Sequence, residues 1–157
     1  MDGRLYRGAK PVMWSPVEKT ALAEAEIEYE DHTSTTIYAR FPVTHAAHAS
    51  LEGASIIIWT TTPWTMPANR AVAYGDDISY QVTEVLAAND GALCAKGDVV
   101  VIADDLAESV MRAIGASETK IRAHLTGREM AGSIAAHPMA GHGYDFDVPL
   151  LAGSHVT

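Results

Sequence analysis

The run at residues 56–72 constrains the fold of this chain more than any other feature. Its sequence is IIIWTTTPWTMPANRAV. The leading isoleucines predict a buried strand, and the two prolines remove backbone freedom directly after it. A rigid turn of this kind presents four threonine hydroxyls in fixed positions, where they can bind a substrate or place a water molecule. Because threonine is also common in ordinary strands and turns, the residues alone leave a purely structural role open.

The size and charge of the chain limit the classes of protein to which it can belong. A length of 157 residues is sufficient for one domain with a real core. A formal net charge of −9, with only 11 Lys and Arg, argues against a free-standing nucleic-acid-binding protein, which normally has a basic face. A protein that contacts only the last nucleotides of an RNA is compatible with this charge.

The chain has no apolar run long enough for a membrane span and no signal peptide, so we expect no membrane partner and a cytoplasmic location. Cys94 is the only cysteine, which excludes an intrachain disulfide and a four-thiolate zinc site. We interpret it as a small buried hydrophobe.

Two histidine pairs, His45 with His48 and His137 with His142, lack a carboxylate at a ligand spacing. We therefore predict no metal site and interpret them as solvated or hydrogen-bonded imidazoles.

Short apolar and β-branched segments, separated by turn residues, predict many strands. Residues 4–20 are interpreted as an extended arm. In residues 21–30, Ala and Glu favour a helix, but apolar residues alternate with glutamates, which predicts a strand with one charged face. A helical turn is predicted within 44–51. Further strands are predicted at 35–43, 54–60, 71–74, 78–85, 92–95, 99–103, 120–125 and in short pieces after 132. Among these strands, 71–74 with 78–85 and 92–95 with 99–103 are expected to form hairpins.

One helix is clear in the second half of the chain. Asp104 or Asp105 can cap its first turn, and Gly115 can end it in the left-handed conformation. Its expected buried face repeats every four residues and consists of Leu106, Val110 and Ile114. Many short strands with one helix predict a mainly β fold with α decoration (α+β), built as a barrel or a strongly curved sheet.

The run at residues 56–72 also resembles the threonine-rich segment in the editing domain of isoleucyl-tRNA synthetases, a barrel-containing domain of class I aminoacyl-tRNA synthetases. Residues 5–16 (LYRGAKPVMWSP) and 20–29 are similar to the segment that leads from the catalytic core into this domain. Residues 137–138 and 147–157 resemble the approach to the second half of the editing pocket. Valyl and leucyl enzymes typically place Arg-Pro-Glu or Arg-Pro-Asp where this chain has TPW, so the isoleucyl family is favoured over these sister families.

The resemblance implies a function in proofreading, namely the hydrolysis of mischarged valyl-tRNA(Ile) after valine has been transferred to the tRNA. Removal of valine before its transfer is a further option. Binding energy alone separates isoleucine from valine too weakly, and this pair is the standard example of that limit. The parent enzyme would attach isoleucine to tRNA with ATP and Mg, whereas no cofactor is expected in this segment. The expected partners are the 3′ end of a tRNA(Ile) that carries a wrong amino acid and the catalytic core of the parent synthetase.

The resemblance also assigns the pocket. The expected catalytic residues are Thr61 and Thr62, which contact the terminal ribose and the attacking water. The expected substrate-binding residues are Thr60, Trp64, Thr65 and Asn69. Residues 1–20 would be the arm toward the absent catalytic core, and residues 21–157 would be the editing domain.

The family completes its pocket with a Gly-Thr-Gly segment, a His-x-Ala-Pro motif and an Asp that should follow Thr157. The chain would therefore be truncated before this C-terminal motif, and we expect it to be weak or inactive as a hydrolase by itself. Two alternatives stay open. One is a non-catalytic β-barrel that binds a small polar ligand, since the residues give no complete catalytic set. The other is a free-standing deacylase, against which the negative charge counts.

Overall fold

The computed structural model describes residues 7–156, which divide into two units between Ser34 and Thr35. In the first unit, β1 (Trp14–Ser15) and β2 (Thr20–Ala21) pair in antiparallel fashion and the 3-10 turn η1 (Glu24–Glu26) follows. Residues 4–6 of the predicted arm, the first two residues of the similar segment at 5–16, and Thr157 lie outside the described residues.

The strand predicted at residues 21–30 is wrong. The pairing of β2 ends at Ala21, η1 follows, and residues 27–36 have no regular structure. The Glu26 carboxylate accepts a hydrogen bond from the Ala23 N–H at 2.7 Å, which stabilises the helical turn. An alternating pattern needs a partner that covers its apolar face, and this segment is almost entirely exposed. The helical propensity of Ala and Glu therefore prevails locally.

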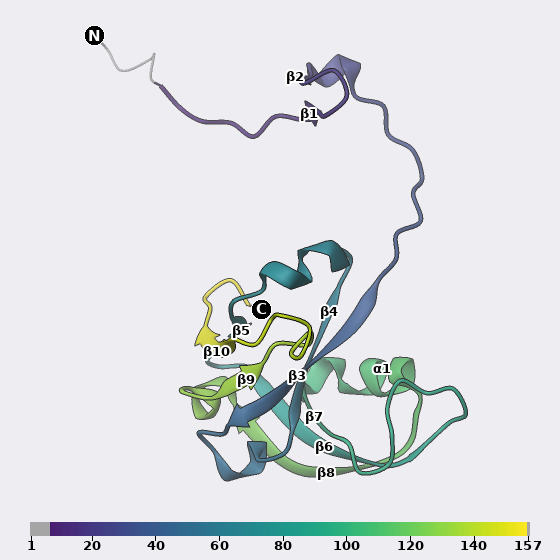
Figure 1. The fold of residues 1–157 in the computed structure, drawn as a ribbon, viewed down its shortest axis with the longest axis vertical. Coiled ribbons are helices and arrows are strands. Elements are labelled where there is room, and N and C mark those ends of the chain that lie inside the picture. Colours follow the sequence, from purple (N-terminus) through teal and green to yellow (C-terminus); the bar gives the residue numbers. More distant parts are fainter. Residues whose placement is uncertain (1–6, 157) are drawn as a thin grey trace. The chain divides into compact units, whose positions relative to one another are not determined.

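The second unit is an eight-stranded mixed sheet with one α-helix (Figure 1). The strand order is β5-β10-β9-β3-β4-β7-β6-β8, in which only β10 with β5 and β4 with β7 are parallel. Its elements in chain order are β3 (Ile37–His45), η2 (Ala49–Leu51), β4 (Ser55–Thr60), η3 (Pro63–Ala68), β5 (Val72–Tyr74), β6 (Ser79–Ala88), β7 (Val99–Ala103), α1 (Asp104–Ile114), β8 (Ala116–Thr126), η4 (Gly127–Met130), β9 (Ile134–Ala136) and β10 (Asp147–Ala152).

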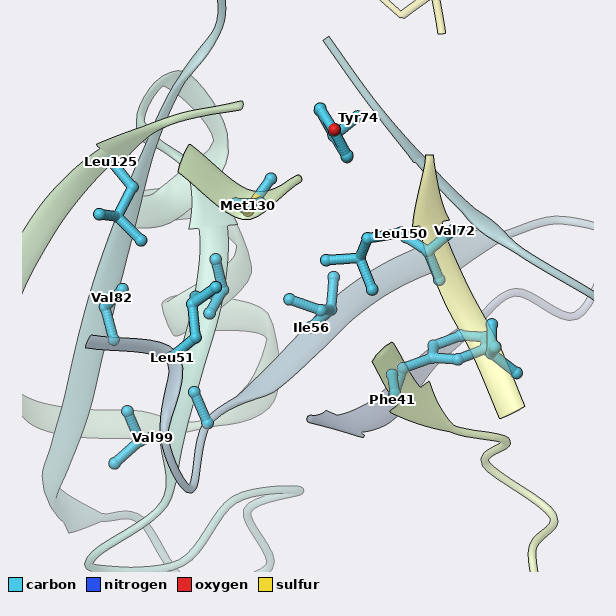
Figure 2. Packing of buried hydrophobic residues seen from close by; sticks show 14 of the residues in the cluster. Phe41, Leu51, Ile56, Val72, Tyr74, Val82, Val99, Leu125, Met130 and Leu150 are labelled. Carbon is cyan, nitrogen blue, oxygen red and sulfur yellow. The ribbon is translucent and has the colours of Figure 1, made fainter. Parts of the chain in front are cut away.

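Strand β4 lies inside the sheet and supplies apolar side chains to both faces. Successive strand residues point to opposite faces, so Ile56 and Ile58 pack in the main core, whereas Ile57 packs with residues of α1. Figure 2 shows side chains from distant parts of the sequence, among them Phe41 and Leu150, in the main core. Phe41 is fully buried, and burial of a side chain of this size stabilises the fold by about 1.5–3 kcal/mol.

The predicted helix is confirmed as α1, which packs against β6, β7 and β8 (Figure 1). Gly115 ends it with φ of 84°, as expected for a left-handed cap. The buried face differs from the prediction at its start, because Leu106 is 57% exposed while Ala107 is buried. Neither aspartate is the N-cap: Asp104 is the first helical residue, and its carboxylate accepts a hydrogen bond from a serine of β6.

The mainly β class is confirmed, but no closed barrel is found among the described residues. The sheet begins at β5 and ends at β8, and no strand ladder joins these two strands. After β8 the chain turns into η4, whose backbone contacts the turn between β5 and β6. The N–H of Gly127 donates to the Ile78 carbonyl at 3.0 Å, and the N–H of Arg128 donates to the Asp76 carbonyl at 3.3 Å. A turn therefore joins the two ends of the sheet where a barrel would need paired strands.

Both predicted hairpins are wrong, although their strands at 71–74, 78–85 and 99–103 are present in β5, β6 and β7. Strand β5 pairs in parallel with β10, and β6 pairs with β7 and β8. Residues 92–95 form no strand; they belong to a loop in which the Asp98 carboxylate accepts a hydrogen bond from the Ala95 N–H at 2.8 Å. A short strand can be predicted from its local sequence pattern, but its partner strand depends on contacts that are distant in the sequence.

Candidate functional site

We call residues 60–69 the threonine loop. Its first residue, Thr60, is also the last residue of β4 and pairs with Ile37 of β3. At Thr62 the backbone turns (φ −124°, ψ 63°), and Pro63 begins η3. Proline suits this first position because the N–H that it lacks would have no partner within the helix. The loop therefore begins at the end of a buried strand, as the sequence predicts.

Hydrogen bonds join three of the predicted site residues. The Oγ1 of Thr60 lies 3.1 Å from the Oγ1 of Thr62 and accepts a hydrogen bond from the Thr62 backbone N–H at 3.0 Å. The Thr65 hydroxyl donates to the Thr62 carbonyl at 2.7 Å. Thr60, Thr62 and Thr65 thus belong to one hydrogen-bonded turn with fixed hydroxyl positions.

The other predicted site residues lie on the same loop but outside this network. Thr61 is exposed, and Trp64 is 73% exposed. Asn69 is half-buried, and its backbone N–H donates to the Met66 carbonyl at 3.0 Å. Within residues 7–156, no side-chain hydrogen bond involves Thr61, Trp64 or Asn69. These side chains are therefore free of the contacts that fix the other three.

His137 contacts the threonine loop, although the sequence did not identify it as a site residue. Its Nε2 lies 2.8 Å from the Met66 carbonyl, and the side chain is only 1% exposed. The interpretation as a hydrogen-bonded imidazole is confirmed. The two residues are 71 positions apart, so no local pattern could predict their contact. The likeness of residues 137–138 to the family was the only signal at this position.

An apolar cavity of about 460 Å³ lies beside β4, and the threonine loop forms none of its wall. The sheet opens there because β4 pairs with β7 only at Ser55 and Ile56, so the second half of β4 lacks this neighbour. Trp59, which is 55% exposed, and Leu106 both line the cavity. Burial raises the pKa of the Tyr74 phenol in the same wall, so this group is protonated at neutral pH.

The His, Cys, Asp and Glu side chains of residues 7–156 are scattered rather than grouped. These residues contain no group of three or more His, Cys, Asp or Glu side chains that could hold a metal ion. No helix among them is long and apolar enough to cross a membrane.

Cys94 is partly buried, and its Sγ lies 3.4 Å from the Ile114 carbonyl. Burial raises the pKa of this thiol, which makes it a poor nucleophile at neutral pH.

The threonine loop can bind and orient a polar group, but it contains no base of its own. A hydroxyl donates and accepts hydrogen bonds. Among the described residues, no carboxylate or imidazole forms a hydrogen bond with Thr60, Thr62 or Thr65. The guanidinium of Arg70, the charged residue after the loop, lies 3.8 Å from the centre of the Phe146 ring. The arrangement therefore favours placement of a substrate or a water over covalent catalysis.

Comparison with known proteins gives a consistent result along the whole chain. The family model described as tRNA synthetases class I (I, L, M and V) matches residues 1–141. The isoleucine–tRNA ligase of Gluconobacter oxydans (strain 621H) is 50% identical over 100% of this chain and 17% of its own length. The isoleucine–tRNA ligase of Caulobacter vibrioides is 51% identical over 99% of the chain and 16% of its own length. The isoleucine–tRNA ligase of Bradyrhizobium diazoefficiens is 48% identical over 99% of the chain and 16% of its own length. The chain therefore spans about a sixth of the length of these relatives.

Proposed function

Because the chain belongs to the class I tRNA synthetase family and corresponds to a segment of isoleucine–tRNA ligases, we propose that it is the editing domain of such a ligase. Its substrate would be valyl-tRNA(Ile), which it would hydrolyse to valine and free tRNA. The parent enzyme would attach isoleucine to tRNA with ATP and Mg. The arm at residues 1–20 and the domain at residues 21–157 are part of this proposal, as is a cytoplasmic location.

The observation that carries the proposal is the hydrogen-bonded turn of the threonine loop. Editing requires that an ester carbonyl and a water are held together in one orientation, and orientation is what fixed hydroxyls supply. Thr60 and Thr65 fix the backbone around Thr62 through hydrogen bonds of 3.0 Å and 2.7 Å. The exposed side chains of Thr61 and Trp64 lie on the same loop, within reach of a ligand.

In the proposed reaction, an oriented water attacks the ester carbon of the mischarged tRNA. The bond from that carbon to the ribose oxygen breaks, and the ribose hydroxyl leaves with a proton. Thr61 and Thr62 would bind the terminal ribose and the water, and Thr65 and Asn69 would form the pocket wall. Thr60 and Trp64 would also bind the substrate. A second, smaller pocket admits valine and excludes isoleucine because the larger side chain does not fit.

A deacylation assay tests the proposal. The chain and a version extended past Thr157 with the next residues of its parent are incubated with valyl-tRNA(Ile) and with isoleucyl-tRNA(Ile). We expect weak or no hydrolysis by the chain itself, and hydrolysis of the valyl ester alone by the extended version. An extended version that is folded and leaves both esters intact contradicts the proposal. Equal activity of the two versions would show that the pocket does not need the residues after Thr157.

The apolar cavity beside β4 favours a second candidate, a non-catalytic module that binds a small ligand. Its volume of about 460 Å³ falls in the range of small-molecule sites. Its wall is mainly apolar, and Tyr74 and Asp105 are among its polar residues. Titration with a fluorescent apolar probe, with Leu106→Trp at an exposed residue of the wall to narrow the cavity, tests this candidate. Saturable binding that the variant abolishes supports it, and binding that the variant leaves unchanged contradicts it.

A further inference from the structure

The hydroxyl hydrogen bonds of the threonine loop join Thr60, Thr62 and Thr65 at its start and do not reach Met66. Its 3-10 helix, η3, spans only six residues, contains Pro67 and lacks a side-chain N-cap. Short 3-10 helices have poor hydrogen-bond geometry and are marginal by themselves. Met66 is the only buried residue of η3. Any group that fixes Met66 from outside therefore controls where the rest of the loop lies.

The carbonyl of Met66 accepts two hydrogen bonds. One comes from the Asn69 backbone N–H at 3.0 Å, and the other involves His137 Nε2 at 2.8 Å. The second ring nitrogen of His137, Nδ1, accepts a hydrogen bond from the Met139 N–H at 3.1 Å. Because Nδ1 is the acceptor, the partners assign the proton to Nε2, which donates to Met66. This single tautomer connects the threonine loop to the segment after β9.

Aromatic rings hold the imidazole in this orientation. The Tyr144 ring stacks on His137 with centroids 5.3 Å apart and an interplanar angle of 26°, and the Phe146 ring lies 5.1 Å away. The Phe146 ring also contacts the guanidinium of Arg70, which follows the threonine loop. Two points of the chain around η3, Met66 and Arg70, therefore contact one cluster centred on His137. A buried group that is enclosed in this way cannot turn to another partner without breaking the packing.

We propose that His137 is a positioning residue for the threonine loop, in which its Nε2–H fixes the Met66 carbonyl and thereby the positions of Thr65 and Asn69. The inference rests on the proposed editing function for its catalytic consequence only. Its structural content, a loop fixed by one donated hydrogen bond, stands on the geometry. The residue touches neither substrate nor water in this account, and it acts through Met66.

Two amide variants separate the donated bond from the packing. In His137→Gln, the terminal NH₂ can reach the position of Nε2 and donate to Met66. In His137→Asn, the shorter side chain can keep the contact of Nδ1 with Met139, but its NH₂ falls short of Met66. Both variants lose the ring and its stacking; His137→Gln keeps the donor to Met66, and His137→Asn keeps the acceptor for Met139. His142→Asn, at an exposed histidine of the same segment, is the matched control.

Hydrogen–deuterium exchange of the backbone amides in this chain gives the first readout. We expect His137→Asn to speed exchange of the Asn69 and Thr65 amides about tenfold, which corresponds to about 1.4 kcal/mol, while amides of β6 and β7 keep their protection. His137→Gln should restore most of the loop protection, and His142→Asn should change nothing. The proposal is overturned if Asn and Gln give the same loop exchange, or if exchange rises equally throughout the sheet.

Kinetics in the intact parent ligase give the second readout. We expect His137→Asn to lower kcat for hydrolysis of valyl-tRNA(Ile) about tenfold, because a loosened loop holds Thr65 and Asn69 in the reactive arrangement less often, and His137→Gln to recover most of the rate. Isoleucine activation should be unchanged. If the unmodified ligase hydrolyses the ester and His137→Asn does so equally well, the positioning role is wrong. If the unmodified ligase does not hydrolyse it, the editing function is wrong, and the exchange experiment still decides whether His137 fixes the loop.

Discussion

Replacement of Thr60 by valine tests whether hydroxyls hold the threonine loop. Valine has nearly the same shape, so the change removes Oγ1 and little else. Two hydrogen bonds disappear, one from the Thr62 N–H at 3.0 Å and one with the Thr62 hydroxyl at 3.1 Å. Each hydrogen bond contributes about 0.5–1.5 kcal/mol net. Because Thr60 is half-buried and Thr62 is exposed, water replaces part of this, and we expect a total loss of about 1 kcal/mol.

Urea unfolding followed by circular dichroism measures this loss. With a slope of about 1–3 kcal/mol per M of urea, a destabilisation of about 1 kcal/mol lowers the midpoint by about 0.3–1 M. Thr61→Val is the matched control, since Thr61 is exposed and takes no part in the hydroxyl network. Its midpoint should stay within error of that of the unmodified chain. The slope should be the same in all three proteins, because the change does not alter the surface that unfolding exposes.

Equal midpoints for Thr60→Val and Thr61→Val would refute the argument, because the network would then contribute nothing. A loss far above 3 kcal/mol would also refute the argument, because so large a destabilisation requires a disrupted core rather than two lost hydrogen bonds. In either case the fixed hydroxyls could not be the reason why this loop orients a ligand.

Three further predictions concern the rest of the fold. Gly115→Ala should lower the free energy of unfolding in urea by about 1–2 kcal/mol or more, because φ of 84° is left-handed and the new Cβ would lie 2.7 Å from the Cβ of Ala92; an unchanged midpoint would contradict this. Hydrogen bonds from the Thr126 backbone N–H and hydroxyl lower the pKa of Glu129. Its stabilisation is therefore present above the ordinary glutamate pKa and is lost as the pH falls through the lower folded-state value, so Glu129→Gln should destabilise the chain at pH 7 and do so progressively less as the pH falls below the ordinary glutamate pKa. Cys94 should react with Ellman's reagent at pH 8 more slowly in the folded chain than in urea, since burial raises the pKa of its thiol; equal rates would contradict its partial burial.

The sequence predicted the elements that depend on local pattern. Strand β4 and helix α1 are examples, because an isoleucine run and a left-handed Gly115 each carry their own signal. The position of the threonine loop at the end of β4 is likewise local. The strand predicted at the glutamate-rich segment 21–30 is wrong because no partner strand covers the apolar face of its alternating pattern.

Partners and closure were not predictable in the same way. The pairing of β5 with β10 joins Val72 to Leu150, and no residue near either position indicates the other. The open sheet depends on how η4 meets the turn between β5 and β6. The contact of His137 with Met66 is of the same kind, since it depends on the whole fold to bring the two residues together. The roles of the individual threonines stay predictions.

The central claim, that the threonine loop edits mischarged tRNA, is tested most directly by Thr62→Arg in the intact parent ligase. The measured quantity is the rate of valyl-tRNA(Ile) hydrolysis, with isoleucine activation measured beside it and Thr44→Arg, at an exposed threonine of β3, as the control. We predict that Thr62→Arg abolishes hydrolysis and leaves activation nearly unchanged, because the large side chain fills the space meant for a small one, while Thr44→Arg alters neither. Normal hydrolysis by the Thr62→Arg ligase would contradict the assignment of this loop as the editing site.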